Sequence, residues 1–173
     1  MNRSVTGLLL EWPTMLLIAA LVLGAATLPV AFVPQQKDTC GAAVLTMVLR
    51  YWGVAADHDA IAAELVSPGL RGIRGSALEA FARRRGLTAV AHEGDLDQLR
   101  DYVAKGRPMI VTLDAGRGRF HDLVVVGFED QRVIVHDPAE GAARRLASGD
   151  FEKRWARAGH YALLVLPGGA PPP

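Results

Sequence analysis

The sequence predicts a single α+β domain in which N-terminal helices pack on a C-terminal antiparallel sheet. The chain has 173 residues, of which 50% are hydrophobic and 21% are charged, as in one ordinary globular domain. Apolar residues recur at helical spacing in the first half, whereas the second half holds short apolar runs bounded by glycine and proline. Helices followed by strands are typical of an α+β domain, and we expect the helices to gather on one side of the sheet.

The most apolar predicted helix runs from Cys40 to Trp52, and we expect it to be buried all round because nearly every face is hydrophobic. Asp38 or Thr39 can cap its N-terminus, and Gly53 can end it. Three further helices are expected at residues 57–66 (starting at 57 or 58), 76–85 and 96–105.

Four strands are predicted after these helices, because β-branched residues are enriched in the short apolar runs. They are expected at residues 108–113, 121–128, 131–136 and 161–166, with a short helix at 151–158 before the last strand. A tight turn at Glu129 and Asp130 would join the second and third strands in a hairpin. The start of one strand would then lie beside the end of the next.

An apolar segment precedes the domain. Residues 14–33 carry no charge, and a span of about 20 residues can cross a membrane as a helix. Arg3, the apolar run from Met15 to Leu23 and the small residues 24–26 also fit an export signal, and a buried N-terminal helix is the third alternative. In the first two cases Arg3 predicts a body outside the cytoplasm, periplasmic or extracellular. We expect the anchor or signal at residues 1–31, the domain at 32–167 and a flexible tail at 168–173.

The charge pattern argues against nucleic acid as a partner. With 19 Lys and Arg against 18 Asp and Glu, the formal net charge is +1. The run Arg83–Arg85 falls at a predicted helix end, where basic residues are favourable without any partner. A structural zinc site needs several Cys or His ligands at short spacing, and the chain has one cysteine. We therefore expect no nucleic acid, no metal and no cofactor.

Cys40, the single cysteine, is either an inert buried thiol or a reactive one. At the start of a helix, unpaired N–H groups and the positive end of the helix dipole favour the thiolate. His121 opens one strand of the predicted hairpin and Asp137 follows the other, so their side chains should be neighbours. Asp137 could then orient His121 as the base for Cys40. The alternatives are a solvated strand histidine and a turn-forming aspartate.

Gln35 and Gln36 lie just ahead of Cys40. Acyl transfer develops an oxyanion, which a side-chain amide beside a backbone N–H at a helix start can stabilise. Gln35 is the candidate donor, and Gln36 is the alternative. The alternative is that both glutamines are ordinary polar residues of a loop.

Five blocks of the sequence together resemble one peptidase family. They are Val33-Pro34-Gln35-Gln36-Lys37-Asp38-Thr39-Cys40-Gly41, Gly75-Ser76-x-Leu78, His121 followed by Val124-Val125-Val126-Gly127, Asp137-Pro138-x-x-Gly141, and Phe151-x-x-x-Trp155. In this order they resemble cysteine peptidase family 39, the bacteriocin-processing peptidases of the papain-like clan. The resemblance covers residues 32–166. Asp122 departs from it, because a bulky apolar residue often follows the histidine in that family.

The resemblance implies a papain-like fold and four site roles. Cys40 would be the nucleophile, His121 the general base, Asp137 its orienting residue and Gln35 the oxyanion donor. The implied activity is a cysteine endopeptidase acting through a thioester on peptide or protein substrates, with leader peptides cut at a double glycine. Family members are often the first part of an ATP-driven export transporter, so a transporter is an implied partner.

Two other functions stay open on the sequence. The chain contains no G-x-x-x-x-G-K-[ST] nucleotide loop, so it resembles the stand-alone, exported or anchored members of the family. The main alternative to a peptidase is a non-catalytic papain-like module that binds peptides at the cell envelope. Three His-Asp pairs, at residues 58–59, 121–122 and 136–137, would suit a metal-dependent phosphohydrolase. Two of those pairs fall on predicted strands, from which converging ligands are hard to build.

Overall fold

The computed structural model describes residues 27–67, 69–70 and 72–169. Within these residues the chain forms five helices and six strands. The helices are α1 (Cys40–Tyr51), α2 (His58–Leu65), α3 (Gly75–Arg84), α4 (Leu96–Ala104) and α5 (Ser148–Arg157). The strands are β1 (Thr88–Glu93), β2 (Met109–Gly116), β3 (Arg119–Glu129), β4 (Arg132–Asp137), β5 (Gly141–Ala147) and β6 (Tyr161–Leu166).

The six strands form one antiparallel sheet in the order β1-β6-β2-β3-β4-β5. The predicted α+β class is confirmed, and each expected helix and strand is present with ends shifted by a few residues. β3 lies in the middle of the sheet between β2 and β4, and α1 packs against it. The first turn of α1 therefore lies close to the start of β3.

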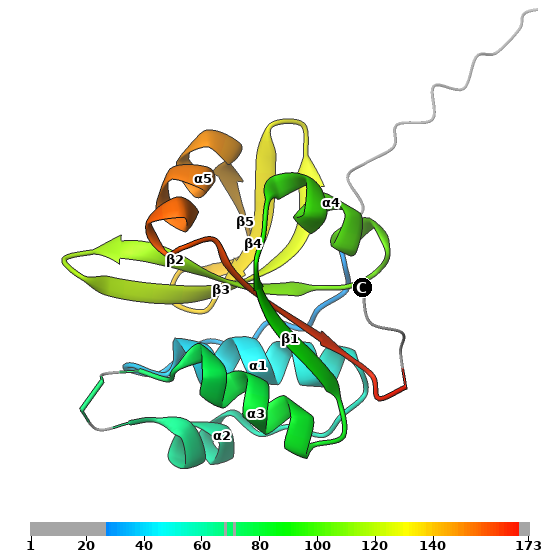
Figure 1. Cartoon of the computed structure of the whole chain (residues 1–173), viewed down its shortest axis with the longest axis vertical. Coiled ribbons are helices and arrows are strands. Elements are labelled where there is room, and N and C mark those ends of the chain that lie inside the picture. Colours follow the sequence, from blue (N-terminus) through cyan, green and yellow to red (C-terminus); the bar gives the residue numbers. More distant parts are fainter. Residues whose placement is uncertain (1–26, 68, 71, 170–173) are drawn as a thin grey trace, which may run out of the picture.

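Helices cover both faces of the sheet, so the expectation that they gather on one side is wrong. Figure 1 shows α1, α2 and α3 on one side of the strands and α4 and α5 on the other. Leu45 and Val124 belong to the core on the α1 side, whereas Trp155 and Val125 belong to the core on the other side. Consecutive strand residues point to opposite faces. The continuous apolar run 123–126 therefore serves both cores, as strands buried on two faces require.

The helix α1 is buried on almost all sides, as predicted. Every residue from Gly41 to Leu49 is buried. Its N-terminal residue Cys40 is only half-buried. The helix is thus held rigidly by packing while its first residue stays accessible.

The two edge strands, β1 and β5, were not expected from the sequence. β5 reads Gly-Ala-Ala-Arg-Arg-Leu-Ala and is mostly exposed. Alanine and charged residues have low strand propensity, but charged side chains on an edge also discourage pairing with another chain. β1 pairs with β6 and β5 pairs with β4, so each edge strand uses the backbone N–H and C=O groups of its neighbour. The sequence of an edge strand does not reveal that such a neighbour is present.

Residues 27–33 run along the body of the domain. The Leu28 N–H donates to the Val126 carbonyl at 2.8 Å, and Val30 and Val33 are buried. These residues belong to the apolar run 14–33, so packing begins ahead of the boundary expected at residue 32. The proposed anchor or export signal falls mainly on residues 1–26, which lie outside the described residues, as does most of the expected tail. No helix in the described part of the chain is both long enough and apolar enough to cross a membrane.

Candidate active site

Cys40 begins α1, and the preceding residue Thr39 occupies the N-cap position. The Thr39 hydroxyl accepts from the Gln36 N–H at 2.9 Å, donates to the Gln36 carbonyl at 3.0 Å and lies 3.0 Å from His58 Nε2. It makes no capping bond to α1. The first N–H groups of the helix are thus left for the Cys40 sulfur or for a substrate oxygen.

His121 and Asp137 lie side by side at adjacent strands. His121 Nε2 and Asp137 Oδ1 are 2.7 Å apart, and both side chains are largely shielded from solvent. Antiparallel pairing of β3 and β4 explains this contact, because the start of one strand meets the end of the other. The residues lie together as the hairpin predicted.

The connecting turn lies one residue later than expected. Glu129 pairs with Arg132, so Asp130 and Gln131 form the turn. Asp130 has φ 49°, which suits the left-handed turn position that aspartate tolerates. Farther along β3, the pairing with β4 shows a register shift between Val125 and Gly127.

Asp137 is fixed by a short turn of its own. Its Oδ1 atom also accepts from the N–H groups of Ala139 at 2.9 Å and Glu140 at 3.2 Å. Burial acts to raise the pKa of Asp137, but His121 and these two N–H groups outweigh it and lower the pKa. The carboxylate is therefore charged and oriented toward the imidazole.

His121 is close to Cys40 as well as to Asp137. Burial lowers the pKa of His121, but the hydrogen bond to Asp137, the Cys40 side chain and the charges of both groups outweigh burial and raise the pKa to about 10. Since Asp137 engages Nε2, the Nδ1 atom is the one left for the thiol. The arrangement favours an imidazolium between two acidic groups.

Asp122 also contacts the thiol, a contact that the sequence did not predict. Its Oδ2 atom lies 3.8 Å from Cys40 Sγ, and its Oδ1 atom accepts from Thr112 Oγ1 at 2.6 Å. Burial raises the pKa of Asp122, against the Thr112 hydrogen bond, the His121 charge and the Cys40 thiol, which lower it. In the sequence, the one feature that could have indicated this contact was the position of Asp122 directly after His121.

Gln35 and Gln36 differ clearly in their contacts. The Gln36 side-chain amide donates to Asp59 Oδ1 at 2.9 Å, and the same oxygen lies 2.8 Å from His58 Nδ1. The Gln35 side chain is turned inward: its Oε1 atom is buried without a hydrogen-bond partner among the described residues, and its backbone N–H donates to the Pro138 carbonyl at 3.0 Å. The Gln36 amide is thus engaged by Asp59, whereas the Gln35 side chain packs inward.

The three His-Asp pairs serve different local roles. The pair at 58–59 holds the loop before Cys40, and the pair at 121–122 lies at the thiol. In the remaining pair, His136 Nε2 donates to the Val30 carbonyl at 2.8 Å, and its Nδ1 accepts from the Ala143 N–H at 3.1 Å. No cluster of three or more His, Cys, Asp or Glu side chains within the described ranges could hold a metal ion.

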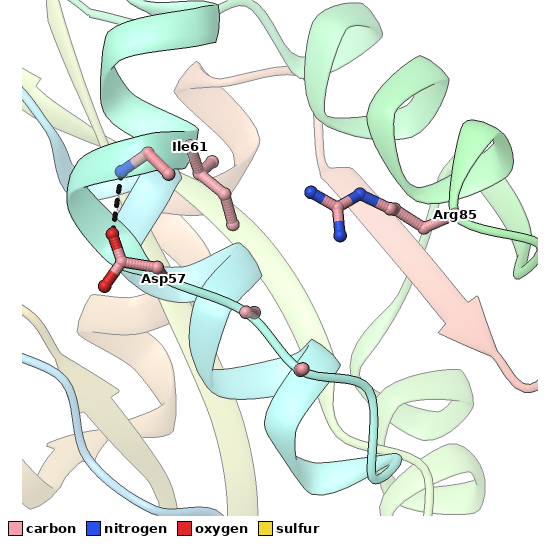
Figure 2. Close-up of a pocket in the computed structure, with 6 residues that line it drawn as sticks. Asp57, Ile61 and Arg85 are labelled. Carbon is pink, nitrogen blue, oxygen red and sulfur yellow. Dashed lines mark hydrogen bonds between the residues drawn. The ribbon is translucent and has the colours of Figure 1, made fainter.

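A surface pocket lies apart from this cluster. Figure 2 shows it between the start of α2, where Asp57 caps the helix through the Ala60 N–H, and Arg85 at the end of α3. Ile61 and three alanines, Ala55, Ala56 and Ala60, complete its lining. None of its lining residues belongs to the Cys40 site.

The comparisons with known proteins agree with this arrangement. The sequence matches the Peptidase_C39 like family over residues 27–163. The chain belongs to this family. The resemblance inferred from the five sequence blocks is therefore confirmed, and the chain is a C39 peptidase-like domain.

Solved C39 peptidase domains share its fold. The peptidase domain of Streptococcus ComA, a bifunctional ABC transporter involved in quorum sensing, superposes with a TM-score of 0.68 at 25% identity, covering 79% of this chain and 97% of that one. A double glycine motif protease from an AMS/PCAT transporter, solved with its leader peptide, gives 0.68 at 21% identity, covering 82% and 94%. A C39-like peptidase from Bacillus anthracis gives 0.68 at 19% identity, covering 83% and 98%. No curated protein matches the chain.

Proposed function

We propose that the chain is a cysteine endopeptidase with Cys40 as nucleophile, His121 as general acid and base, and Asp137 as the residue that orients His121. One observation carries this proposal. His121 is bound through Nε2 to Asp137 at 2.7 Å and has Cys40 beside it, so a thiol, an imidazole and a carboxylate are connected in that order. This is the arrangement that thiol nucleophiles use for acyl transfer.

The reaction begins with the Cys40 thiolate and the His121 imidazolium. The sulfur attacks the peptide carbonyl carbon, and His121 gives its proton to the departing amine as the C–N bond breaks. The thioester left on Cys40 is then attacked by water, whose proton passes to His121. The C–S bond breaks, the acyl fragment leaves with a new C-terminal carboxyl group, and the Cys40 thiolate and His121 imidazolium are restored. Asp137 keeps its negative charge throughout and stabilises the imidazolium.

Gln35 is proposed as the oxyanion donor. Its side chain lies in a partly buried position five residues before Cys40, whereas the Gln36 amide is bonded to Asp59. An amide N–H from Gln35 and a backbone N–H at the start of α1 would together bind the developing negative charge. Such donors each contribute about 3 to 4 kcal/mol to the transition state.

The proposed substrates are leader peptides cut after a double glycine. The support comes from similar proteins: one neighbour is named as a double glycine motif protease and was solved with a leader peptide, and another is part of an ABC transporter. A peptide is therefore the proposed ligand, and an export transporter is the proposed partner.

Incubation with a peptide library that includes Gly-Gly, Ala-Ala and Val-Val sites, followed by mass spectrometry, tests the activity and its specificity. We expect cleavage after Gly-Gly, no turnover by Cys40→Ala, and an intact fold in that variant because Cys40 is only half-buried. Cleavage spread equally over the three sites would reject the leader specificity. Peptide binding without any cleavage would instead indicate a non-catalytic peptide-binding module.

We also propose that residues 1–26 direct the domain to a membrane, as an anchor or export signal, with the body outside the cytoplasm. The small residues 24–26 suit the cleavage site of an export signal, and they lie just before Leu28, whose N–H donates to the Val126 carbonyl. N-terminal sequencing of the protein from its native membrane and exported fractions would separate the two versions: an export signal leaves a new N-terminus near Thr27, and an anchor leaves the chain intact in the membrane. An intact chain found only in the cytosol would reject both.

A further inference from the structure

The Asp122 carboxyl group is in contact with the nucleophile but has no role in the mechanism above. The residue is only 8% exposed. Its Oδ2 atom lies 3.8 Å from Cys40 Sγ, and the Thr112 hydroxyl holds its Oδ1 atom at 2.6 Å. Among the described side chains, no Lys, Arg or His forms an ion pair with it. The nearest cation is the His121 imidazolium, whose charge lowers the pKa of Asp122 against the effect of burial.

The backbone makes room for this carboxyl beside the sulfur. A Cβ atom at Gly41 would lie 3.3 Å from Asp122 Oδ2 and 3.1 Å from the Ile73 Cβ. The absence of a side chain directly after Cys40 therefore permits the close approach of Asp122. The contact between Asp122 and Cys40 thus depends on Gly41 in the first turn of α1 as well as on the position of Asp122 on β3.

Titratable groups from several elements surround Asp122. His121 is the next residue on β3, and Cys40 faces it from α1. From β6, Tyr161 is near enough that the charges of Asp122 and of Glu79 on α3 add to burial in raising its pKa. The immediate charged partners of Asp122 are therefore Cys40 and His121.

We propose that Asp122 is a positioning residue that holds the Cys40 sulfur through the contact at its Oδ2 atom and, through its own proton, controls how readily this sulfur becomes a thiolate. When ionised, the carboxylate accepts the S–H group and repels a thiolate through like charge. When protonated, it donates its O–H group to the thiolate and stabilises it. Thr112 sets the orientation, because its hydroxyl fixes the oxygen that does not face the sulfur.

This arrangement makes the stabilisation of the Cys40 thiolate depend on pH. The thiolate is stabilised at acid pH, where Asp122 is protonated, and less so at higher pH, where Asp122 is ionised. Burial raises the pKa of Asp122, so the protonated form persists at a higher pH than for an exposed carboxyl. As pH rises and Asp122 ionises, the thiolate form of Cys40 loses stabilisation. Any effect of Asp122 on peptide cleavage rests on the proposed function. The reactivity of the Cys40 sulfur does not rest on it, because this reactivity can be measured without peptide turnover.

Alkylation by iodoacetamide measures the sulfur directly, since a C–S bond forms at its methylene carbon and iodide leaves. Rates would be recorded from about pH 4 to about pH 9 for the full chain, for Asp122→Asn, for Thr112→Val and for the control Glu129→Gln. Asn mimics the neutral carboxyl in shape and can donate to the thiolate. Glu129 is a carboxylate on the same strand that pairs with Arg145, at the end of β3 away from Cys40. Circular dichroism would verify that each variant is folded.

We expect Asp122→Asn to react like the unmodified chain at the acid end and about tenfold faster near neutral pH, where a like charge has been removed. Thr112→Val should shift in the same direction by a smaller factor, because the lost hydrogen bond lets Asp122 keep its proton to higher pH. Glu129→Gln should follow the unmodified chain. A folded Asp122→Asn variant whose profile superimposes on that of the unmodified chain would overturn the proposal. If that variant does not fold, an unchanged Thr112→Val profile overturns it.

Discussion

His121 Nε2 on β3 and Asp137 Oδ1 at the end of β4 lie 2.7 Å apart, although 16 positions separate them in the sequence. The contact fixes which ring nitrogen faces Cys40. It also explains why the His121 pKa rises in spite of burial, since the carboxylate stabilises the imidazolium. The orientation of the His121 ring thus depends on the hairpin geometry.

Asp137→Asn should lower kcat/KM about a hundredfold or more, because the amide can hold the turn but lacks the negative charge that stabilises the imidazolium. Steady-state kinetics on a cleaved peptide measure this. Asp95→Asn is the matched control, since Asp95 also accepts a backbone N–H, from Gln98, at the start of α4. Equal activity of the two variants would contradict the orienting role of Asp137.

Gln35→Ala should lower kcat by roughly a hundredfold or more, because an oxyanion donor acts only in the transition state. Gln36→Ala should have a small effect, since its amide is committed to Asp59. The comparison requires kcat and KM separately for both variants. A large loss in Gln36→Ala with normal Gln35→Ala would move the donor by one residue.

Thr39→Val should lower the free energy of unfolding by about 1 to 3 kcal/mol, because it leaves the buried ring of His58 and the Gln36 N–H without their hydroxyl partner. Thr46→Val is the control, as Thr46 makes one bond, to the Ala42 carbonyl within α1. Denaturant unfolding measures both. Similar stabilities for the two variants would show that the Thr39 network contributes little.

Stability should fall between neutral pH and about pH 10, because the pKa of His121 is raised from 6.5 to about 10. A raised pKa means that the folded state holds the proton more tightly, so its contribution is complete below pH 6.5 and is lost as pH passes through the folded value. His121→Gln should flatten this part of the stability profile. His160→Gln, which removes a histidine paired with Glu152, should keep the slope. An unchanged slope in His121→Gln would contradict the assignment.

The order of helices and strands was readable from the sequence, because apolar periodicity reports which faces are buried. The helix at Cys40 and the strand at His121 were found in this way. The edge strands β1 and β5 were not, because their composition carries little strand preference and their pairing depends on β6 and β4. The placement of helices on both faces of the sheet was missed for a related reason: a run such as 123–126 indicates burial but not which helix covers each face.

In the candidate site, too, some features could be predicted from the sequence and others depend on tertiary contacts. The sequence by itself determined the residues of the proposed triad, because Cys40 at a helix start and the neighbouring positions of His121 and Asp137 on successive strands follow from local pattern and hairpin topology. Only the tertiary structure decided that Gln36 is bound to Asp59 and that Asp122 reaches the thiol. Those contacts join residues on elements far apart in the chain. Their distances depend on how α1 packs against β3, which side-chain volumes throughout the core set together.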